Sequence, residues 1–331
     1  MSFKKTKSEP LKFNDTELNE VDEHKHLGLT LSNNLTWSSH IDNIISDTGC
    51  MSDVLKRLKY DLDKRTLEKV YFSFIRPKLE YASHIWDNCS KRDSDKLEQF
   101  QMEVARTVTG ARRGTSHDLI NSELRWETLS TRRKNVKLLN MYKMVHNKSP
   151  AYLCNLLPNN RAEPCYNLRN KENLPIPKTR TELFRKSFVP SSINLWNSLS
   201  CEKKYIDIEQ FKRNLKDHDS VKELYYLGSR ANNIKHAQLR MQCSKLNSHL
   251  FSLHVLDNPS CPCGAPDEDS FHFFYNCPLY IPQRQILMNE IANFHITDWN
   301  MLLFGNENLN FEDNTRLFQA VHKYIENTNR L

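Results

Sequence analysis

The spacing of apolar side chains changes once, near the N-terminus, and is helical from there on. Between residues 2 and 31 the apolar positions come in short runs, such as Leu11-Lys12-Phe13, and residues 26–31 alternate apolar with small or polar side chains. This pattern predicts short strands and a β-hairpin. From Ser38 onward apolar side chains recur every three or four residues, which is typical of α-helices. The pattern therefore predicts a mainly α fold.

The first two helices are expected between Ser38 and about residue 86. The first carries an apolar stripe that Gly49 interrupts, and Asp63 stands where the second needs a cap for its free N–H groups. Pro77 lies inside the second apolar stripe. Because proline has no N–H and clashes with the preceding turn, we expect a kink or a break there.

Further helices are expected at residues 93–109, 128–147 and 208–215, and at 238–250 immediately before a loop rich in cysteine. After Pro278 the apolar spacing indicates two or three closing helices. Because the helices before residue 150 carry apolar stripes that can bury one another, we expect them to form a bundle.

A proline-rich stretch separates that bundle from the rest of the chain. Prolines recur over about forty residues, at Pro150, Pro158, Pro164, Pro175, Pro177 and Pro190. We expect extended backbone here, forming a basic connector that carries Lys178, Arg180, Arg185 and Lys186. Phe184, Phe188 and Trp196 lie among these charges. They can stack on unpaired bases or anchor the connector onto the helices, and for Trp196 we favour the anchoring role.

The composition narrows the class of protein. Of 331 residues, 38% are hydrophobic, and no apolar run is long enough to cross a membrane. The N-terminus carries lysines without the apolar stretch of a secretory signal. Nine cysteines, six of them scattered singly, favour free thiols in a reducing compartment. We therefore expect an intracellular protein, nuclear or cytoplasmic. Only seven glycines argue against a nucleotide-binding α/β enzyme.

The positive charge is concentrated in the middle of the chain. The net charge is +7; the surplus lies between residues 91 and 250, whereas the residues after 250 are acidic. Candidate phosphate contacts are Arg112 and Arg113 in a loop between two glycines, and Arg132, Arg133 and Lys134 on the helix expected at 128–147. Such charges can be an ordinary solvated surface, but their regional clustering favours nucleic acid.

The candidate metal ligands are Cys261, Cys263, His272 and Cys277. Three thiols and one imidazole within so short a segment are a complete donor set for tetrahedral Zn²⁺. Prolines and a glycine around them leave no room for a long helix or strand, so we expect a metal to hold the loop. The alternative is that the cysteines are ordinary small residues and that His272 packs between its phenylalanine neighbours. The spacing differs from common zinc fingers, and no neighbouring residue has the character of a catalytic base.

Several segments, taken in order, resemble reverse transcriptases of non-LTR (LINE-type) retrotransposons of the jockey-like and CR1-like kind. The first group resembles the region just after the polymerase palm: His26-Leu-Gly-Leu-Thr-Leu31, Leu35-Thr-Trp37, Phe74-Ile-Arg-Pro-Lys-Leu-Glu-Tyr-Ala82 with Trp86, and Gly110-Ala-Arg-Arg-Gly114. The second group resembles the C-terminal end of the same proteins: Arg180-Thr-Glu-Leu183, Phe188-Val-Pro190, Leu195-Trp-Asn197, Leu246-Asn-Ser-His-Leu250, Cys261-x-Cys263-Gly264, His272-Phe273 and Cys277-Pro278.

The resemblance implies a division of the chain into four parts. Residues 1–31 would be a β remnant of the palm end, 32–150 a helical thumb-like domain, 151–235 a basic connector with short helices, and 236–331 a helix, a zinc knuckle and the C-terminal helices. In the family these regions grip template RNA and target DNA. The four metal ligands match a family motif, whereas the basic positions match only a region.

The leading hypothesis is therefore a nucleic-acid-binding C-terminal fragment that is no enzyme on its own. The family's polymerase needs paired aspartates to hold two metal ions, and the sequence contains no Asp-Asp pair and no candidate catalytic residue. Expected partners are template RNA, target DNA and a separate palm-bearing chain, without a membrane. The alternative hypothesis is a repurposed remnant that binds protein through its helices and uses zinc only to fold its tail.

Overall fold

The structure is a computed structural model that describes residues 12–14, 16–17, 19, 21–158, 173–215, 223–296 and 298–331. Its described part is mainly helical, as expected, and has two small antiparallel hairpins near the N-terminus. Strand β1 (Lys12–Phe13) pairs with β2 (Thr16–Glu17), and β3 (Glu23–His26) pairs with β4 (Leu29–Ser32).

The alternating pattern over residues 26–31 does not form one continuous strand. Leu27 and Gly28 form a two-residue turn between β3 and β4, and both have positive φ, 46° and 83°. That backbone matches the twist of a hairpin, and the glycine adopts it without a steric cost. The second hairpin lies against the first helix of the body, where Leu29 joins the core.

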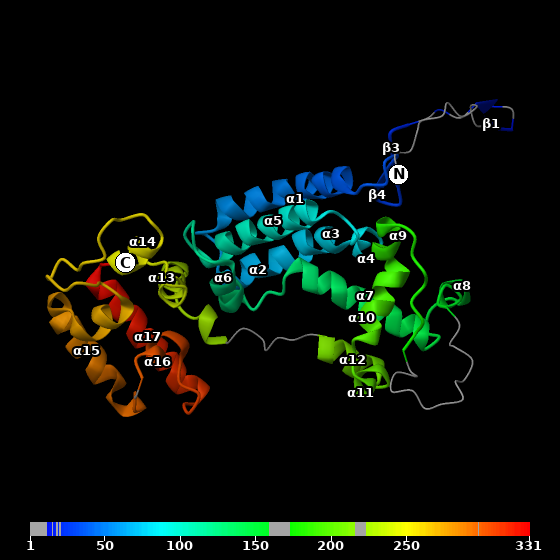
Figure 1. Ribbon diagram of the computed structural model, residues 1–331. Helices are drawn as coiled ribbons and strands as arrows, with labels where there is room; N and C mark the ends of the chain where they lie inside the picture. Colours follow the sequence, from blue (N-terminus) through cyan, green and yellow to red (C-terminus); the bar gives the residue numbers. More distant parts are fainter. Residues whose placement is uncertain are drawn as a thin grey trace.

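The helical body contains the helices from α1 to α7. Their bounds are α1 (Ser38–Leu58), α2 (Lys64–Val70), α3 (Arg76–Glu80), α4 (Ser83–Trp86), α5 (Lys91–Thr109), α6 (His117–Leu124) and α7 (Leu129–Val145). Figure 1 shows α1, α2, α3 and α5 lying side by side. The first core forms between them, around side chains such as Ile41, Leu67 and Trp86. These helices bury apolar side chains against one another, and α1 runs through Gly49 without a break.

Local signals fix most of the ends of these helices. Asp63 caps α2 and accepts a hydrogen bond from the Thr66 N–H, as predicted. Pro77 stands in the first turn of α3, directly after a π-helical turn at Tyr71–Ile75, so the winding of the helix changes before the proline although its residues stay helical from Lys64 to Glu80. Helix α5 ends at Gly110, whose φ of 72° places it in the left-handed region.

The region expected to be an extended connector is largely helical in its described part. It contains α8 (Ala151–Cys154), α9 (Glu182–Lys186), α10 (Phe188–Asn197), α11 (Cys201–Lys204) and α12 (Ile208–Leu215). Pro190 is tolerated because it lies in the first turn of α10. Trp196 is 2% exposed and packs beside Tyr142 and Phe211 in a second core, which agrees with the anchoring role favoured for it. The predicted helix at 208–215 is confirmed by α12.

The C-terminal part forms a third core. It contains α13 (Arg230–Arg240), α14 (Asn247–Ser252), α15 (Ile281–Ile291), α16 (Asn300–Phe304) and α17 (Phe311–Thr328), with 3-10 turns at Glu223–Tyr226, Pro278–Tyr280 and Ala292–Phe294. The three helices after Pro278 agree with the prediction. The single helix predicted over 238–250 is wrong, because α13 ends at Arg240 and α14 begins at Asn247.

Helix α13 joins the C-terminal part to the body (Figure 1). Ala237 and Met241 pack into the first core, whereas Leu239 packs into the third. Glu123 of α6 binds both Lys64 of α2 and Arg240 of α13, with nitrogen-to-oxygen distances of 2.8–2.9 Å. None of the helices that the structure describes is long and apolar enough to cross a membrane.

Candidate metal centre and nucleic-acid interface

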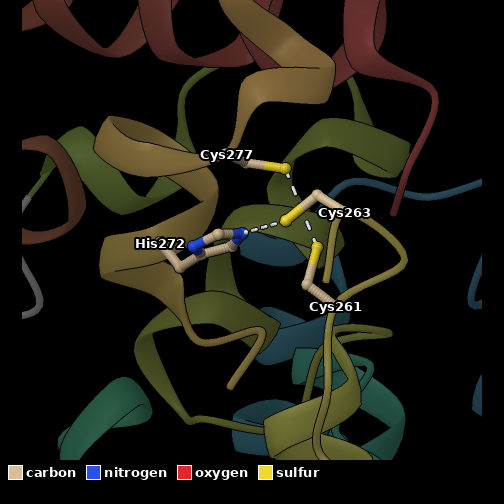
Figure 2. Close-up of side chains that lie close together, drawn as sticks. All are labelled: Cys261, Cys263, His272 and Cys277. Carbon is tan, nitrogen blue, oxygen red and sulfur yellow. Dashed lines mark hydrogen bonds between the residues drawn. The ribbon is translucent and has the colours of Figure 1, made fainter. Parts of the chain in front are cut away.

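The four predicted metal ligands lie together in space. Their donor atoms, three sulfurs and one imidazole nitrogen, all lie within 4.8 Å of one another. Figure 2 shows the side chains of Cys261, Cys263, His272 and Cys277 converging. The Cys261 and Cys277 sulfurs are 3.7 Å apart, and the Cys263 sulfur is 3.3 Å from His272 Nε2. Ligands around tetrahedral zinc are separated by roughly 3.5–3.8 Å, so this arrangement has the size of a zinc site.

Two tight backbone turns create this convergence. In the first, the Gly264 N–H donates to the Cys261 carbonyl, and the Cys261 N–H donates to the Ala265 carbonyl. Gly264 has a φ of 93°, which favours glycine and aims both cysteines inward. In the second, a π-helical turn at His272–Asn276 ends in a hydrogen bond from the Cys277 N–H to the His272 carbonyl, at 2.8 Å.

The surrounding helices brace the loop with polar contacts. Arg284 of α15 donates to the carbonyls of Phe274 and Cys277, and Tyr324 of α17 donates to the carbonyl of Phe273 at 2.6 Å. The Glu268 carboxylate, which is almost fully buried, accepts from Arg330 and from the Asn247 N–H. This acid therefore has a cation of its own in Arg330. A partner more than sixty residues away leaves no local sequence signal.

The protonation of the thiols sets how many protons a cation must displace when it binds. Burial raises the pKa of Cys261 to about 12 and also raises that of Cys277, whereas the Ala265 N–H lowers the pKa of Cys263. A dication between these sulfurs would stabilise their thiolates, so metal binding would release protons. Three thiolates and an imidazole complete a four-coordinate site and leave no open position for substrate. The chemistry fits a structural zinc ion.

Comparison with known proteins supplies no relative from which a role could be transferred: no protein-family model, no curated protein and no solved structure matches this chain. The predicted basic positions fall into three groups in the structure.

The first group, on α7, is largely tied to the body. Arg132 binds Glu80 and Glu127, the latter at 2.9 Å. Arg133 is 3% exposed and donates to Asp87 at 2.8 Å. These two arginines serve the packing of α7 against α3 and α4, so they are not available to a phosphate on the surface. Lys134 is exposed.

The second group, before and on α9, is exposed. Lys178 and Arg180 precede the helix, and Arg185 and Lys186 both lie within salt-bridge distance of Glu182 one turn earlier. Exposed pairs of this kind contribute little stability, so a stronger anion can displace the carboxylate. Arg169 and Lys171, which the sequence places in the same basic connector, lie outside the described residues.

The third group, Arg112 and Arg113, lies at a cavity of about 690 Å³ that we call the basic groove. Arg112 is half-buried next to it, and Arg113 is exposed and lines it. The groove lies between the C-terminal ends of α1 and α5 and the beginning of α13. Its charged lining is Lys56, Lys59, Arg106, Arg113 and Arg230, with Glu103 as the one acid that lines it among the described residues.

Few of these cations have an acidic partner. Arg230 donates to the carbonyls of Lys59 and Thr107, at 2.8 and 3.1 Å, and burial lowers its pKa to about 10. Lys56 forms an exposed pair with Asp53. Within the described ranges, no carboxylate lies within salt-bridge distance of Arg106, Arg113 or Arg230, although helix C-termini offset part of their charge.

Close packing of α13 on the end of α5 shapes the groove. A Cβ on Gly110 would lie 2.6 Å from the Ile234 side chain, so only glycine permits this approach. Gln238 donates to the Gly110 carbonyl at 2.7 Å. Sequence reasoning found the glycine-flanked arginines but missed Lys56, Lys59, Arg106 and Arg230. The lysines stand at the end of a predicted helix, and no sequence signal places Arg230 beside them.

Proposed function

We propose that this chain binds single-stranded nucleic acid as the zinc-stabilised C-terminal region of a reverse transcriptase of the non-LTR retrotransposon class. The observation that carries the proposal is the basic groove, because five cations face one acid across a cavity of about 690 Å³. A phosphodiester backbone supplies a continuous row of anions and releases its counterions when it binds such a surface.

The groove also offers a ring on which a base can stack. Tyr60, which lines it, is 67% exposed, and the Lys59 ammonium lies 4.7 Å from the centre of its ring. Unpaired bases stack on exposed aromatic side chains beside basic residues, whereas paired bases in a duplex are already stacked. Single strands, RNA or DNA, are therefore the favoured ligands.

The assignment to the reverse-transcriptase class rests on the order of the sequence segments that resemble that family. The helical body and the tetrahedral donor set are compatible with it. The proposal gives this chain the task of holding template RNA or target DNA, with zinc maintaining the fold of the C-terminal loop. Nucleotide addition would require a polymerase palm with paired aspartates, which these 331 residues do not contain.

Fluorescence anisotropy tests the proposal with labelled RNA and DNA single strands of about 15 nucleotides. We expect Arg113→Gln to weaken binding of both strands by about three- to tenfold. Arg316→Gln is the matched control. It removes one positive charge from α17, outside the basic groove, where Arg316 pairs with Glu312 on the surface. Equal affinities of the two variants would reject the groove as the interface.

An apolar cavity favours protein binding as the second candidate function. It has a volume of about 410 Å³ and lies where β4 and the start of α1 meet α9. Leu31, Leu35, Leu183 and Phe184, which line it, are 43–62% exposed. Protein partners that survive nuclease treatment and are lost in Phe184→Ser would support this function, whereas partners lost on nuclease treatment would favour the first.

A further inference from the structure

A second charged cavity lies on the body, with a lining different from that of the basic groove. Its volume is about 400 Å³, and it is enclosed by the π-helical turn, the start of α3 and the loop between α6 and α7. Phe72 and Trp126 are aromatic walls, and Arg76, Arg125 and Arg132 also line it. We call it the arginine pocket.

The acceptors in this pocket already have donors. Glu127 accepts from Arg132 at 2.9 Å. The Gln101 oxygen accepts from the Tyr71 hydroxyl at 2.7 Å, and the Gln101 nitrogen donates to the Glu127 carbonyl. The carboxylate and the amide of the lining are therefore engaged within the protein.

Several donors, by contrast, have no acceptor. The side chains of Arg76 and Arg125 form neither a hydrogen bond nor an ion pair within the part of the chain that the structure describes, and the Arg76 guanidinium lies 4.3 Å from the centre of the Phe72 ring. Trp126 is 7% exposed, and its Nε1 is buried without an acceptor among the described residues. Stacking on Tyr71, at 4.0 Å and 11°, fixes the indole in this place. This indole N–H has almost no accessible surface, so the guanidinium groups of Arg76 and Arg125 are the unpaired donors that a ligand in the pocket can reach.

The charges add a second reason for an anion. Burial lowers the pKa of Arg76, and repulsion from Arg132 lowers it further. Glu80 and Glu127 neutralise Arg132, but Arg76 and Arg125 keep their charge without a carboxylate in contact. Guanidinium groups bind phosphate through paired hydrogen bonds and stack on planar rings.

We propose that the arginine pocket binds a phosphate monoester on a nucleoside, either as a free nucleotide or as the 5′-phosphorylated end of a strand. The cavity is larger than a phosphate needs, and its Phe72 and Trp126 walls offer apolar surface to a sugar or base. The basic groove has a separate set of lining residues, so either site can fail without the other.

Isothermal titration of the full chain with adenosine 5′-monophosphate, adenosine and inorganic phosphate tests this site. We expect the nucleotide to bind at least about tenfold more tightly than adenosine. Arg76→Gln and Arg125→Asn should each weaken it by about tenfold, and the asparagine suits the left-handed backbone at Arg125, where φ is 55°. Trp126→Phe keeps an aromatic ring in the wall of the pocket and should weaken nucleotide binding a few-fold. Arg113→Gln, in the basic groove, should leave nucleotide binding unchanged.

A second titration separates the two sources of the phosphate and the two sites. An oligonucleotide with a 5′-phosphate should bind more tightly than its 5′-hydroxyl form, and Arg76→Gln should abolish that difference while keeping general strand binding. If the nucleotide binds but the two oligonucleotides are equal, the ligand is the free nucleotide. Nucleotide binding no tighter than that of adenosine, or unchanged in both arginine variants, would overturn the proposal.

Discussion

The buried carboxylate of Glu123 should be one of the positions most sensitive to substitution. It lies where α2, α6 and α13 meet, and its oxygens bind Lys64 at 2.9 Å and Arg240 at 2.8 Å. The three charged side chains are at most 2% exposed. Burial favours the protonated acid, but Arg240 and Lys64 outweigh it and lower the pKa of Glu123, so the group is ionised at neutral pH.

Glu123→Gln would leave two cations facing a neutral amide in the interior. Breaking a buried ion pair by removing one partner typically costs about 3–5 kcal/mol, and here a single change removes the counterion of two cations. We therefore expect the free energy of unfolding to fall by about 4 kcal/mol. Guanidinium unfolding, followed by the fluorescence of the buried Trp86 and Trp126, measures this change.

Two further variants show whether the charge itself is the cause. Glu209→Gln removes an exposed acid that pairs with Lys212, and it should cost less than about 1 kcal/mol. Replacing Lys64, Glu123 and Arg240 together by Met, Leu and Met should restore most of the loss, because no buried charge is left unpaired. A loss below about 1 kcal/mol in Glu123→Gln would refute the reasoning, as would a triple variant no more stable than the single one.

Three other predictions follow from buried groups. The folded chain should bind one zinc ion, which metal analysis and the thiolate absorption of a cobalt-substituted sample would measure. Cys277→Ser should abolish this binding, whereas Cys50→Ser, at an exposed cysteine outside the cluster, should keep it. Folded wild-type protein without bound metal would contradict the site. Burial lowers the pKa of His249 and of His322 to about 4. Because the folded state favours the neutral imidazoles, their contribution to the free energy of unfolding should be complete above about pH 6.5. It should fall toward pH 4, by on the order of 3 kcal/mol for each histidine. A denaturant midpoint that is the same at about pH 7 and about pH 4.5 would exclude this contribution. Trp196→Ala should cost about 3–5 kcal/mol in the same unfolding assay, and a cost below about 1 kcal/mol would show that its ring is not a core element.

The helices that the sequence predicted well carry their own start and stop residues. Thr128 caps α7 and Gly110 ends α5, and both features lie within a few residues of the helix they bound. The wrong predictions of helix and loop boundaries occurred where contacts between residues far apart in the sequence determine the structure. Tertiary packing of Trp196 stabilises a helix inside a proline-rich stretch, and α13 ends at Arg240 although the apolar spacing continues.

The same distinction separates the metal centre from the basic groove. The convergence of the four candidate metal ligands could be predicted because they lie within a short segment, where residue type and spacing can be read from the sequence. The groove could be predicted only in part. Arg113 has a local signal in its flanking glycines, but Arg230 joins it only through the packing of α13 on α5. Similarly, no local pattern indicates that Asp87 neutralises Arg133.

The dependence of single-strand RNA affinity on salt tests the central claim most directly. The logarithm of the association constant should fall linearly with the logarithm of salt concentration, and each lost phosphate contact should reduce the slope by about 0.7. We therefore predict that the double variant Lys59→Gln, Arg113→Gln has a slope shallower than wild type by about 1.4. An identical slope in wild type and variant would show that the basic groove does not hold the nucleic acid.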